Sequence, residues 1–425
     1  MAGPRTPAAT ARPPWRDTLA AIFSARMLFA LLMGFASGLP LLLIGSVLQA
    51  WLKRSGIDLT SIGLFALVGL PYTLKFLWAP LFDRYLPPLL GRRRGWLLIA
   101  QALLAAAIFA LGLAQPAPDS LLAVSIAALA VAFFSASQDI VVDAYRRESL
   151  ADVELGFGSA MYVNGYRIGL LVAGAGGLIL AGSYSYETMY CVMAAVMAAC
   201  IVATLAAPEP PLPEGRPVTL VEAVFLPFRD YFTREGAWLA LAFILLFKLG
   251  DTMASSMTTP FYLDRGYSEA EIGTVVKLFG FWATIAGGTL GGIWILRIGM
   301  RRALWLFGLG QMVSTLGFVV LAGVTPTAAA LATVVALENF TGGLGTAAFV
   351  GFMASLTDRR FTATQYALLS SLMGVPRVFA SAPTGWFAES LGWPGFFLMC
   401  TLIAIPGLAL LRWIARLADG ADPSR

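Results

Sequence analysis

Residues 121–147 read L-L-A-V-S-I-A-A-L-A-V-A-F-F-S-A-S-Q-D-I-V-V-D-A-Y-R-R, an apolar run that ends in a polar stripe. Asp139 and Asp143 are four residues apart, so on a helix their side chains lie on one face, with Ser135 one turn earlier. An ionised carboxylate that faces lipid costs ~2.5–3.5 kcal/mol even on a lenient insertion scale. We therefore expect the stripe to face protein, water or the path of a transported molecule.

The composition of the whole chain matches this apolar run. Of the 425 residues, 58% are hydrophobic and 12% are charged, whereas soluble domains are about 25% charged. Long continuous apolar runs also exclude a membrane β-barrel, because only helices use such runs to cross hydrocarbon. The composition predicts an all-α polytopic membrane protein.

Twelve apolar runs, each bounded by glycine, proline or charged residues, predict twelve transmembrane helices. Each run is close to the ~20 residues that an α-helix needs to span a bilayer. The expected spans are residues 27–52, 60–81, 95–114, 121–145, 157–182, 187–207, 237–263, 269–296, 302–323, 328–356, 363–388 and 395–417.

The distribution of lysine and arginine predicts the orientation of these helices. With the N-terminus in the cytoplasm, 21 of the 29 basic residues fall on the cytoplasmic side, three fall outside and five lie within spans. Cytoplasmic loops of membrane proteins are enriched in lysine and arginine, so we expect both termini in the cytoplasm.

A hydrophilic stretch in the middle of the chain separates two six-helix halves. It starts with a proline-rich break and continues with Val221, Val224, Phe225 and Phe228 at helical spacing, which predicts an amphipathic helix on the inner leaflet. The expected organisation is a cytoplasmic tail (1–26), an N-terminal half (27–207), a linker (208–235), a C-terminal half (236–417) and a second tail (418–425).

The two halves carry matching basic loops. Basic loops follow the second and eighth expected helices at residues 83–94 and 297–302, and arginine pairs follow the fourth and tenth at residues 146–147 and 359–360. Such matches indicate a parallel repeat, as in major facilitator transporters. We assign the first loop to a cytoplasmic gate, with Asp83, Arg84, Arg92, Arg93 and Arg94 as its candidate residues.

Charged residues inside the spans are candidates for a transport site, each with a structural alternative. Lys248 and Asp251 are three residues apart and either neutralise each other or begin a polar face. Lys75 either extends toward the inner surface or lines a cavity. Lys277 and the pair Glu338–Asn339 lie far from the span ends and favour a cavity.

Arginine is the best anion-binding side chain, because guanidinium is always charged and pairs with carboxylates through two hydrogen bonds. Arg167 and Arg377, together with Asn164, are therefore candidate anion ligands. The structural alternative is an ion pair with Asp139 or Asp143.

The chain has no histidine, so proton transfer depends on carboxyl groups. The candidates for proton coupling are Asp139, Asp143, Asp251 and Glu338. Asp139 is favoured because it lies deeper in its span, whereas Asp143 has the alternative of bracing the arginines that follow it.

Five segments in order resemble the AmpG-type muropeptide permeases. They are G-F-A-S-G-L-P (34–40), L-Q-A-W-L (48–52), K-F-L-W-A-P-L-F-D-R-Y (75–85), G-R-R-R-G-W-L-L (91–98) and S-A-S-Q-D-I-V-V-D-A (135–144). The resemblance is densest over residues 27–235. It makes Gln138 a candidate ligand contact, and Gln49 lies in the second segment as a further candidate.

The resemblance implies a proton-driven carrier in the inner membrane of a Gram-negative bacterium, importing anhydro-muropeptides for cell-wall recycling. These substrates carry a disaccharide and several carboxylates, which would suit Lys75, Arg167, Lys248, Lys277 and Arg377. We expect no cofactor, a small-molecule substrate, membrane lipid around the chain, no nucleic-acid partner and a monomer.

Other functions stay open at this point. The wider family contains importers of siderophores and other anionic metabolites, and a non-transporting sensor of wall fragments would keep the same cavity. An ATP-driven carrier is not supported, because no phosphate-binding glycine loop occurs. No loop is long enough to form an active site for lipid-linked sugars, so we expect the protein not to be an enzyme.

Overall fold

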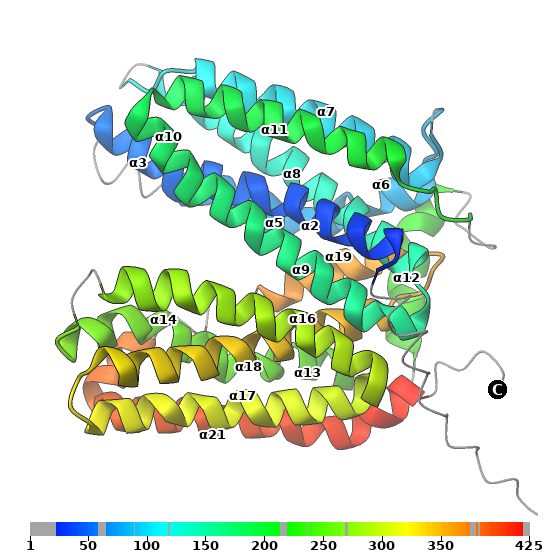
Figure 1. The fold of residues 1–425 in the computed structure, drawn as a ribbon. Coiled ribbons are helices and arrows are strands. Elements are labelled where there is room, and N and C mark those ends of the chain that lie inside the picture. The colour runs from blue at the N-terminus through cyan, green and yellow to red at the C-terminus, as the bar shows by residue number, and fades with distance from the viewer. Residues whose placement is uncertain are drawn as a thin grey trace, which may run out of the picture.

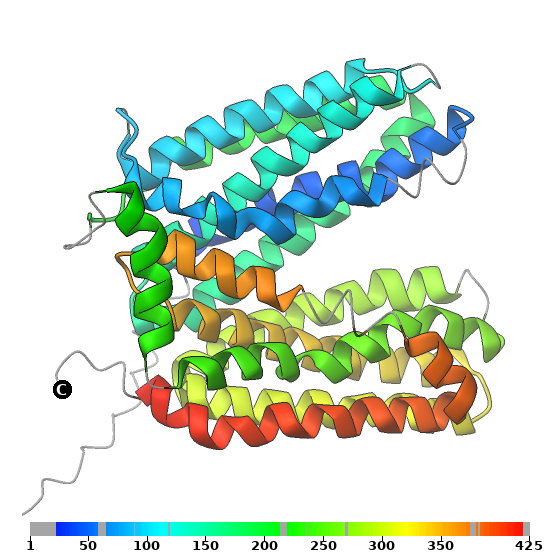
Figure 2. The ribbon, with the colours of Figure 1, turned by 180° about the vertical axis from the view of Figure 1, so that it is seen from behind.

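The computed structural model describes residues 23–57, 65–88, 90–117, 120–212, 219–234, 236–267, 271–374, 380 and 383–419. The described chain is helical and forms two bundles, which meet at one end and part at the other (Figures 1 and 2). We call the closed end, where α12 (Leu220–Thr233) lies, the α12 end, and the parted end the α3 end, after α3 (Ser46–Arg54).

The first bundle, the N-terminal half, contains the helices that precede the linker. They are α2 (Ala25–Ile44), α3, η1 (Phe65–Gly69), α5 (Leu70–Leu74), η2 (Lys75–Leu77), α6 (Ala79–Arg84), α7 (Arg92–Leu113), α8 (Leu121–Ser149), η3 (Asp152–Glu154), α9 (Leu155–Leu171), η4 (Val172–Gly176), α10 (Gly177–Ser183) and α11 (Tyr186–Ala206).

The C-terminal half follows α12. Its helices are α13 (Ala237–Phe247), α14 (Leu249–Asp264), η5 (Ile272–Phe279), α16 (Gly280–Ile298), α17 (Met300–Gly323), α18 (Ala328–Ser355), α19 (Thr362–Met373) and α21 (Thr384–Asp419). The first helix α2 begins, and the last helix α21 ends, at the α12 end (Figure 1). Which side of the membrane this end faces stays a prediction from the basic residues.

Ten helical segments of the described chain are long and apolar enough to span a membrane, so the count of twelve spans stays a prediction. The second expected span is divided into short helices between Phe65 and Arg84, near Pro71 and Pro80, each of which lacks a backbone donor. The eleventh is divided too, because α19 ends at Met373 and α21 begins at Thr384. Within α21, Gly392 adopts φ 65°, which lets two helices meet at a sharp turn.

Helix α8 shows why this bundle belongs in lipid. Leu122, Ile126, Leu129 and Phe133 follow one helical face, and each is between 41% and 74% exposed. The opposite face, with Val124, Ala128 and Val131, is fully buried in the bundle. Both faces are apolar, so the exposed one requires a hydrocarbon surrounding rather than water.

Glycine allows the closest helix contact in the N-terminal half. An added Cβ at Gly34 of α2 would lie 2.0 Å from the Tyr162 carbonyl oxygen of α9, and one at Gly165 would lie 1.9 Å from the Leu31 carbonyl oxygen. No side chain fits at these distances. Backbone-to-backbone packing therefore holds α2 against α9.

The linker helix α12 lies across the end of both halves, roughly perpendicular to the long helices (Figure 2). Its start is fixed by reciprocal hydrogen bonds: Glu222 N–H donates to Thr219 Oγ1, and Thr219 N–H donates to Glu222 Oε2, both at 3.1 Å. Ala223, Pro227 and Tyr231 face the protein, whereas Val221 and Phe225 are exposed.

Candidate functional site

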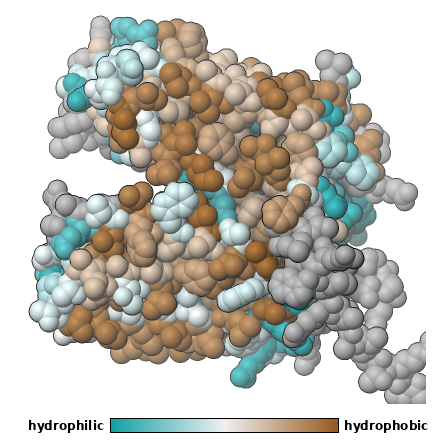
Figure 3. Space-filling model, in the orientation of Figure 1, coloured by the Kyte–Doolittle hydropathy of each residue, from teal (hydrophilic) through white to brown (hydrophobic). Residues whose placement is uncertain are grey.

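The two halves part at the α3 end, and the space-filling view shows hydrophilic residues at the base of the gap between them (Figure 3). Two clusters of charged and polar side chains lie within the spans, one in each half. The first surrounds Asp139 and Asp143 on α8, and the second surrounds Asp251 and Glu338 on α14 and α18.

Asp143 is buried and balanced by two cations. Its carboxylate lies 3.2 Å from a guanidinium nitrogen of Arg146 and 3.8 Å from Lys75 Nζ. Lys75 is itself buried, so it joins this cluster instead of extending to the membrane surface. The pairing fits the bracing role that was the alternative for Asp143.

Asp139 lies one turn deeper and is less completely paired. Its polar and charged neighbours include Ser37, Lys75 and Asp143. Its Oδ1 atom has no hydrogen-bond partner among the described residues. Gln138 beside it is fully buried, so in this conformation it is not exposed to a substrate in the gap.

The second cluster joins Lys248, Asp251 and Glu338. Lys248 Nζ lies 3.3 Å from Asp251 Oδ2 and donates a hydrogen bond of 3.1 Å to Gln311 Oε1. The Lys248–Asp251 pair therefore forms, as the three-residue spacing allowed. Because the pair also binds a third residue, it is part of a network and not an isolated ion pair.

Glu338 completes this cluster from α18. Its Oε2 accepts a hydrogen bond of 2.5 Å from Ser314 Oγ on α17, and Asp251 and Lys248 are its charged neighbours. Arg167 of α9 faces Asp251 from the N-terminal half. Its carboxylate neighbour is therefore Asp251 rather than the α8 aspartates suggested by the sequence.

Among the described residues, the remaining candidates for substrate binding do not belong to either cluster. Asn164 donates a hydrogen bond of 2.7 Å to Thr289 Oγ1 and links α9 to α16. Asn339 accepts one of 3.0 Å from Thr284 Oγ1 within the C-terminal half, and Gln49 is exposed on α3. Arg377 and the side chain of Lys277 lie outside the described residues.

Two residues of the second cluster were missed by the sequence analysis. Gln311 and Ser314 interrupt the apolar span of α17 and contact Lys248 and Glu338. The sequence feature that could have identified them is an amide and a hydroxyl side chain, three residues apart, in the middle of an apolar span.

The α12 end is closed by contacts between the halves, centred on Asp83 at the end of α6. Asp83 is fully buried and accepts hydrogen bonds from Ala363 N–H (3.2 Å), Thr364 N–H (2.9 Å) and Thr364 Oγ1 (2.8 Å). A carboxylate at the first N–H groups of α19 is favoured by the helix dipole and satisfies donors that have no partner within the helix.

Arg93 holds Asp83 in position. One of its guanidinium nitrogens donates to Asp83 Oδ1 at 2.8 Å and to Glu148 Oε1 of α8 at 2.6 Å. Arg92 adds a bond of 2.9 Å to Glu148. All four of these charged groups are buried, so each depends on its partners for stability.

Arg84 and Arg94, also expected in the gate, have side-chain contacts within the N-terminal half. The Arg84 guanidinium lies 5.4 Å from the Tyr85 ring centroid, and Arg94 donates to the carbonyl oxygens of Thr204 (3.2 Å) and Leu205.

Arg146 connects α8 to the C-terminal half. It donates a hydrogen bond of 2.8 Å to the Tyr366 hydroxyl of α19, and its guanidinium lies 4.3 Å from the centroid of the Tyr162 ring. It therefore joins the Asp143 pair to the closed end of the bundle.

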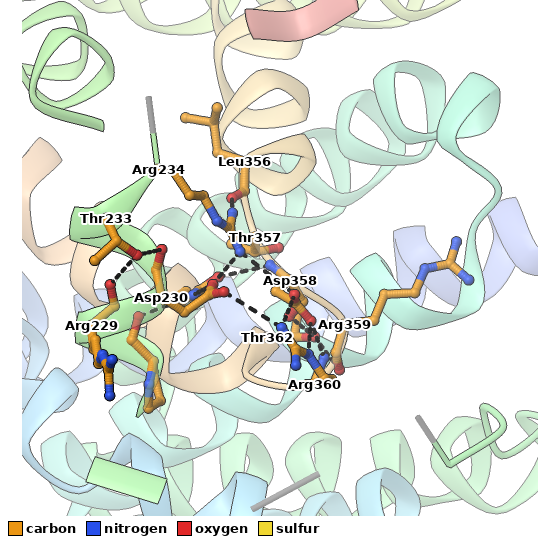
Figure 4. A network of polar contacts seen from close by, with 12 residues as sticks. Arg229, Asp230, Thr233, Arg234, Leu356, Thr357, Asp358, Arg359, Arg360 and Thr362 are labelled. Carbon is orange, nitrogen blue, oxygen red and sulfur yellow. Dashed lines mark hydrogen bonds and ion pairs between the residues drawn. The ribbon is translucent and has the colours of Figure 1, made fainter. Parts of the chain in front are cut away.

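The linker helix is fastened to the loop between α18 and α19 by a network around Asp230 and Asp358 (Figure 4). Arg360 of the loop donates to Asp230 Oδ1 at 3.4 Å and to Asp358 Oδ2 at 2.9 Å, and Gln365 Nε2 of α19 donates to Asp230 Oδ2 at 3.0 Å. Burial alone would raise the pKa of the Asp358 carboxyl, but hydrogen bonds from Arg360 outweigh it, and the pKa lies below its usual range.

Comparison with known proteins agrees with this architecture. The family model described as Major Facilitator Superfamily matches residues 27–381. The chain is 46% identical to the "Anhydromuropeptide permease" of Escherichia coli K12, over 91% of this chain and 79% of the relative. It is 35% identical to "Putative transporter AmpG 4" of Rickettsia conorii, over 92% and 97%.

Solved structures share the fold at low sequence identity. The transporter FucP in the outward conformation aligns with a TM-score of 0.68 at 11% identity, over 92% of this chain and 99% of the other. The human organic anion transporter MFSD10 aligns with a TM-score of 0.63 at 17% identity, over 94% and 100%.

Proposed function

This chain belongs to the Major Facilitator Superfamily, and on that premise we propose that it is a proton-driven carrier that imports anhydromuropeptides. The relative from Escherichia coli, 46% identical, bears the name of a permease for these compounds. The proposal places the chain in the inner membrane of a Gram-negative bacterium, as a monomer with twelve spanning helices and both termini in the cytoplasm. The proton gradient supplies the energy, so no cofactor is needed.

One observation supports this function above the others: each half contributes a cluster in which lysine or arginine is paired with carboxylates. A carrier of an anionic glycopeptide needs cations that bind the carboxylates of the substrate and an acidic group that binds the proton. Lys75 with Asp139 and Asp143 can fill these roles in one half, and Lys248 with Asp251 and Glu338 can fill them in the other.

The transport cycle starts from the conformation described above, which is parted at the α3 end. Substrate enters there, and its carboxylates compete with Asp143 and Asp251 for Lys75, Lys248 and Arg167. The halves then rock about their contact, which separates Asp83 from α19 and opens the α12 end to the cytoplasm.

Asp139 carries the coupled proton in this proposal. A protonated Asp139 no longer attracts Lys75, so proton binding changes the charge available to the substrate. Glu338 is the alternative carrier, because it has a carboxylate and a lysine as charged neighbours, Asp251 and Lys248, as Asp139 has Asp143 and Lys75.

The test is uptake of labelled anhydromuropeptide into proteoliposomes with an imposed pH gradient. We expect accumulation above the external concentration, abolished by a protonophore. Uptake of a ferric siderophore in place of the muropeptide would contradict the substrate assignment. Binding without gradient-dependent uptake would instead support a sensor.

A further inference from the structure

Arg146 of α8 is a buried arginine that uses only part of its hydrogen-bonding capacity. Its side chain is 2% exposed, and its Nη2 atom donates to the Tyr366 hydroxyl at 2.8 Å and lies 3.2 Å from Asp143 Oδ1. The Nε and Nη1 atoms have no hydrogen-bond partner among the described residues. Burying such donors without a partner is costly, so their presence at this place requires an explanation.

Arg146 lies between the first cluster and the α12 end. Asp139, Asp143 and Arg146 occupy positions i, i+4 and i+7 of α8, so they share one face of the helix. A rise of ~1.5 Å per residue places Arg146 ~10 Å from Asp139 in the direction of the closed end. A molecule that leaves the gap through the α12 end passes this level.

A small cavity lies beside the Arg146 guanidinium. It is lined by α2, α8 and α9, with Met33 and Val142 on two sides, and with the Tyr162 ring, whose centroid is 4.3 Å from the guanidinium carbon, on a third. The cavity volume is about 10 Å³, which suffices for one water-sized group and not for a carboxylate. A site for a larger anion therefore forms here only when the α12 end opens.

The residue that covers Arg146 belongs to the other half. Tyr366 lies on α19, two residues after Thr364, whose N–H and hydroxyl bind Asp83. In the proposed cycle, opening separates Asp83 from α19, and the same motion withdraws Tyr366 from Arg146. Nη2 then regains a free hydrogen and forms a two-donor edge with Nε or Nη1, the arrangement by which arginine binds a carboxylate.

We propose that Arg146 binds a carboxylate of the substrate when the α12 end is open, and that the Tyr366 hydroxyl takes this place while the end is closed. The inference deepens the proposed function and rests on it. Arg146 becomes the next cation on the path after Lys75, because both pair with Asp143 from different sides.

The charges of the first cluster fit this role. Two cations, Lys75 and Arg146, face two carboxylates, Asp139 and Asp143, so the group is neutral when both carboxylates are ionised. A proton on Asp139 leaves one positive charge in excess. One substrate carboxylate balances it, which links the bound proton to the bound anion.

Other arginines at this end are already paired within the N-terminal half. Arg26, at the rim of the cavity, lies 2.9 Å from Glu154, and Arg147 lies 2.7 Å from Asp152. Arg146 differs from both because its hydroxyl partner comes from the half that moves away.

The test is the affinity of the full chain in lipid nanodiscs for labelled anhydromuropeptide, measured in an Asp83→Asn background that favours the open α12 end. Arg146→Gln in this background should raise the Kd about tenfold or more, because a charge-assisted pair with the substrate is lost. Arg146→Lys keeps the charge beside Asp143 without the two-donor edge, so it should raise the Kd by a smaller factor even if the glutamine variant does not fold. Arg147→Gln is the matched control and should leave the Kd unchanged.

The same muropeptide with its carboxyl groups converted to methyl esters separates binding from a structural effect. An ester carries no charge for the guanidinium, so the Arg146 variants should bind it as tightly as the Asp83→Asn parent does. An unchanged Kd for the acid, or an equal loss for the acid and the ester, would overturn the inference alone. If neither the wild type nor Asp83→Asn binds the muropeptide, the proposed function fails as well.

Discussion

Neutralising Asp83 is the perturbation that tests the closed end of the carrier most sharply. Asp83→Asn keeps the size of the side chain but removes its charge and turns one acceptor oxygen into an NH₂ group. The native carboxylate accepts four hydrogen bonds: three come from Ala363 and Thr364 of α19, and the fourth comes from Arg93. Each carboxylate oxygen accepts two of them, so the amide loses two and places a donor against donors.

The magnitude follows from this geometry. The bonds that depend on the closed α12 end are those from Ala363 and Thr364 of α19, because Arg93 belongs to the same half as Asp83 and keeps its bonds to Glu148. A hydrogen bond to a charged group is worth ~1.5–3 kcal/mol, and the amide loses at least one of the bonds to α19. This cost applies only while the α12 end is closed, since opening separates Asp83 from α19 in any case. At 1.4 kcal/mol per factor of ten, the variant should shift the equilibrium toward the conformation open at the α12 end by about 10–100-fold.

The assay is single-molecule energy transfer between dyes placed at the α12 ends of α6 and α19, in nanodiscs without substrate. Asp152→Asn is the matched control, because Asp152 also bridges to arginine at this end but its side chain is 63% exposed. Exposed pairs are worth at most about 1 kcal/mol, so the control should change little. Equal populations in Asp83→Asn and wild type, with both proteins folded, would refute the reasoning.

Three further predictions concern other parts of the molecule. Asp139→Asn should abolish gradient-driven accumulation and spare exchange of substrate, and full accumulation by this variant would reject its coupling role. The lowered pKa of Asp358 means that its carboxylate stabilises the α12 network above the unfolded pKa of ~3.9 and loses this effect as pH falls through the folded pKa. The protection of α12 amides against hydrogen exchange, relative to the intrinsic exchange rate at each pH, should therefore fall in acid in the wild type and lose this pH dependence in Asp358→Asn. Gly34→Ala places a Cβ 2.0 Å from a backbone oxygen and should lower the melting temperature by several degrees, whereas Gly182→Ala meets nothing within 4 Å and should not; equal melting temperatures would contradict the α2–α9 contact.

The sequence predicted those parts of the site that depend on local spacing. Asp143 and Arg146 are three residues apart on α8, Lys248 precedes α14 and lies three residues before Asp251, and both pairs form. The apolar runs likewise predicted most of the long helices, because length and hydropathy are properties of a continuous segment.

Contacts between distant segments could not be predicted in this way. Asp83 and Thr364 are 281 residues apart, and nothing in either local sequence indicates that one caps the helix of the other. The structural alternative for Arg167 was an ion pair with an aspartate of α8, whereas its acidic neighbour is Asp251 of the C-terminal half. Only the relative placement of the two halves determines such pairs.

Breaks within the helices were also not predicted from the sequence, although the prolines that indicate them are present. Pro71 and Pro80 both lie in the second expected span, and each removes a backbone donor. An apolar run was interpreted as one helix, whereas the chain forms several short ones. The break matters for the site, because the short turn η2 carries Lys75, whose side chain pairs with Asp143.

The central claim is that substrate and protons move together through this chain. Proteoliposomes that contain a pH-sensitive dye and no imposed gradient measure this directly when anhydromuropeptide is added outside. The account predicts acidification of the interior that follows substrate entry and disappears in Asp139→Asn. Substrate entry without any change of internal pH would contradict it.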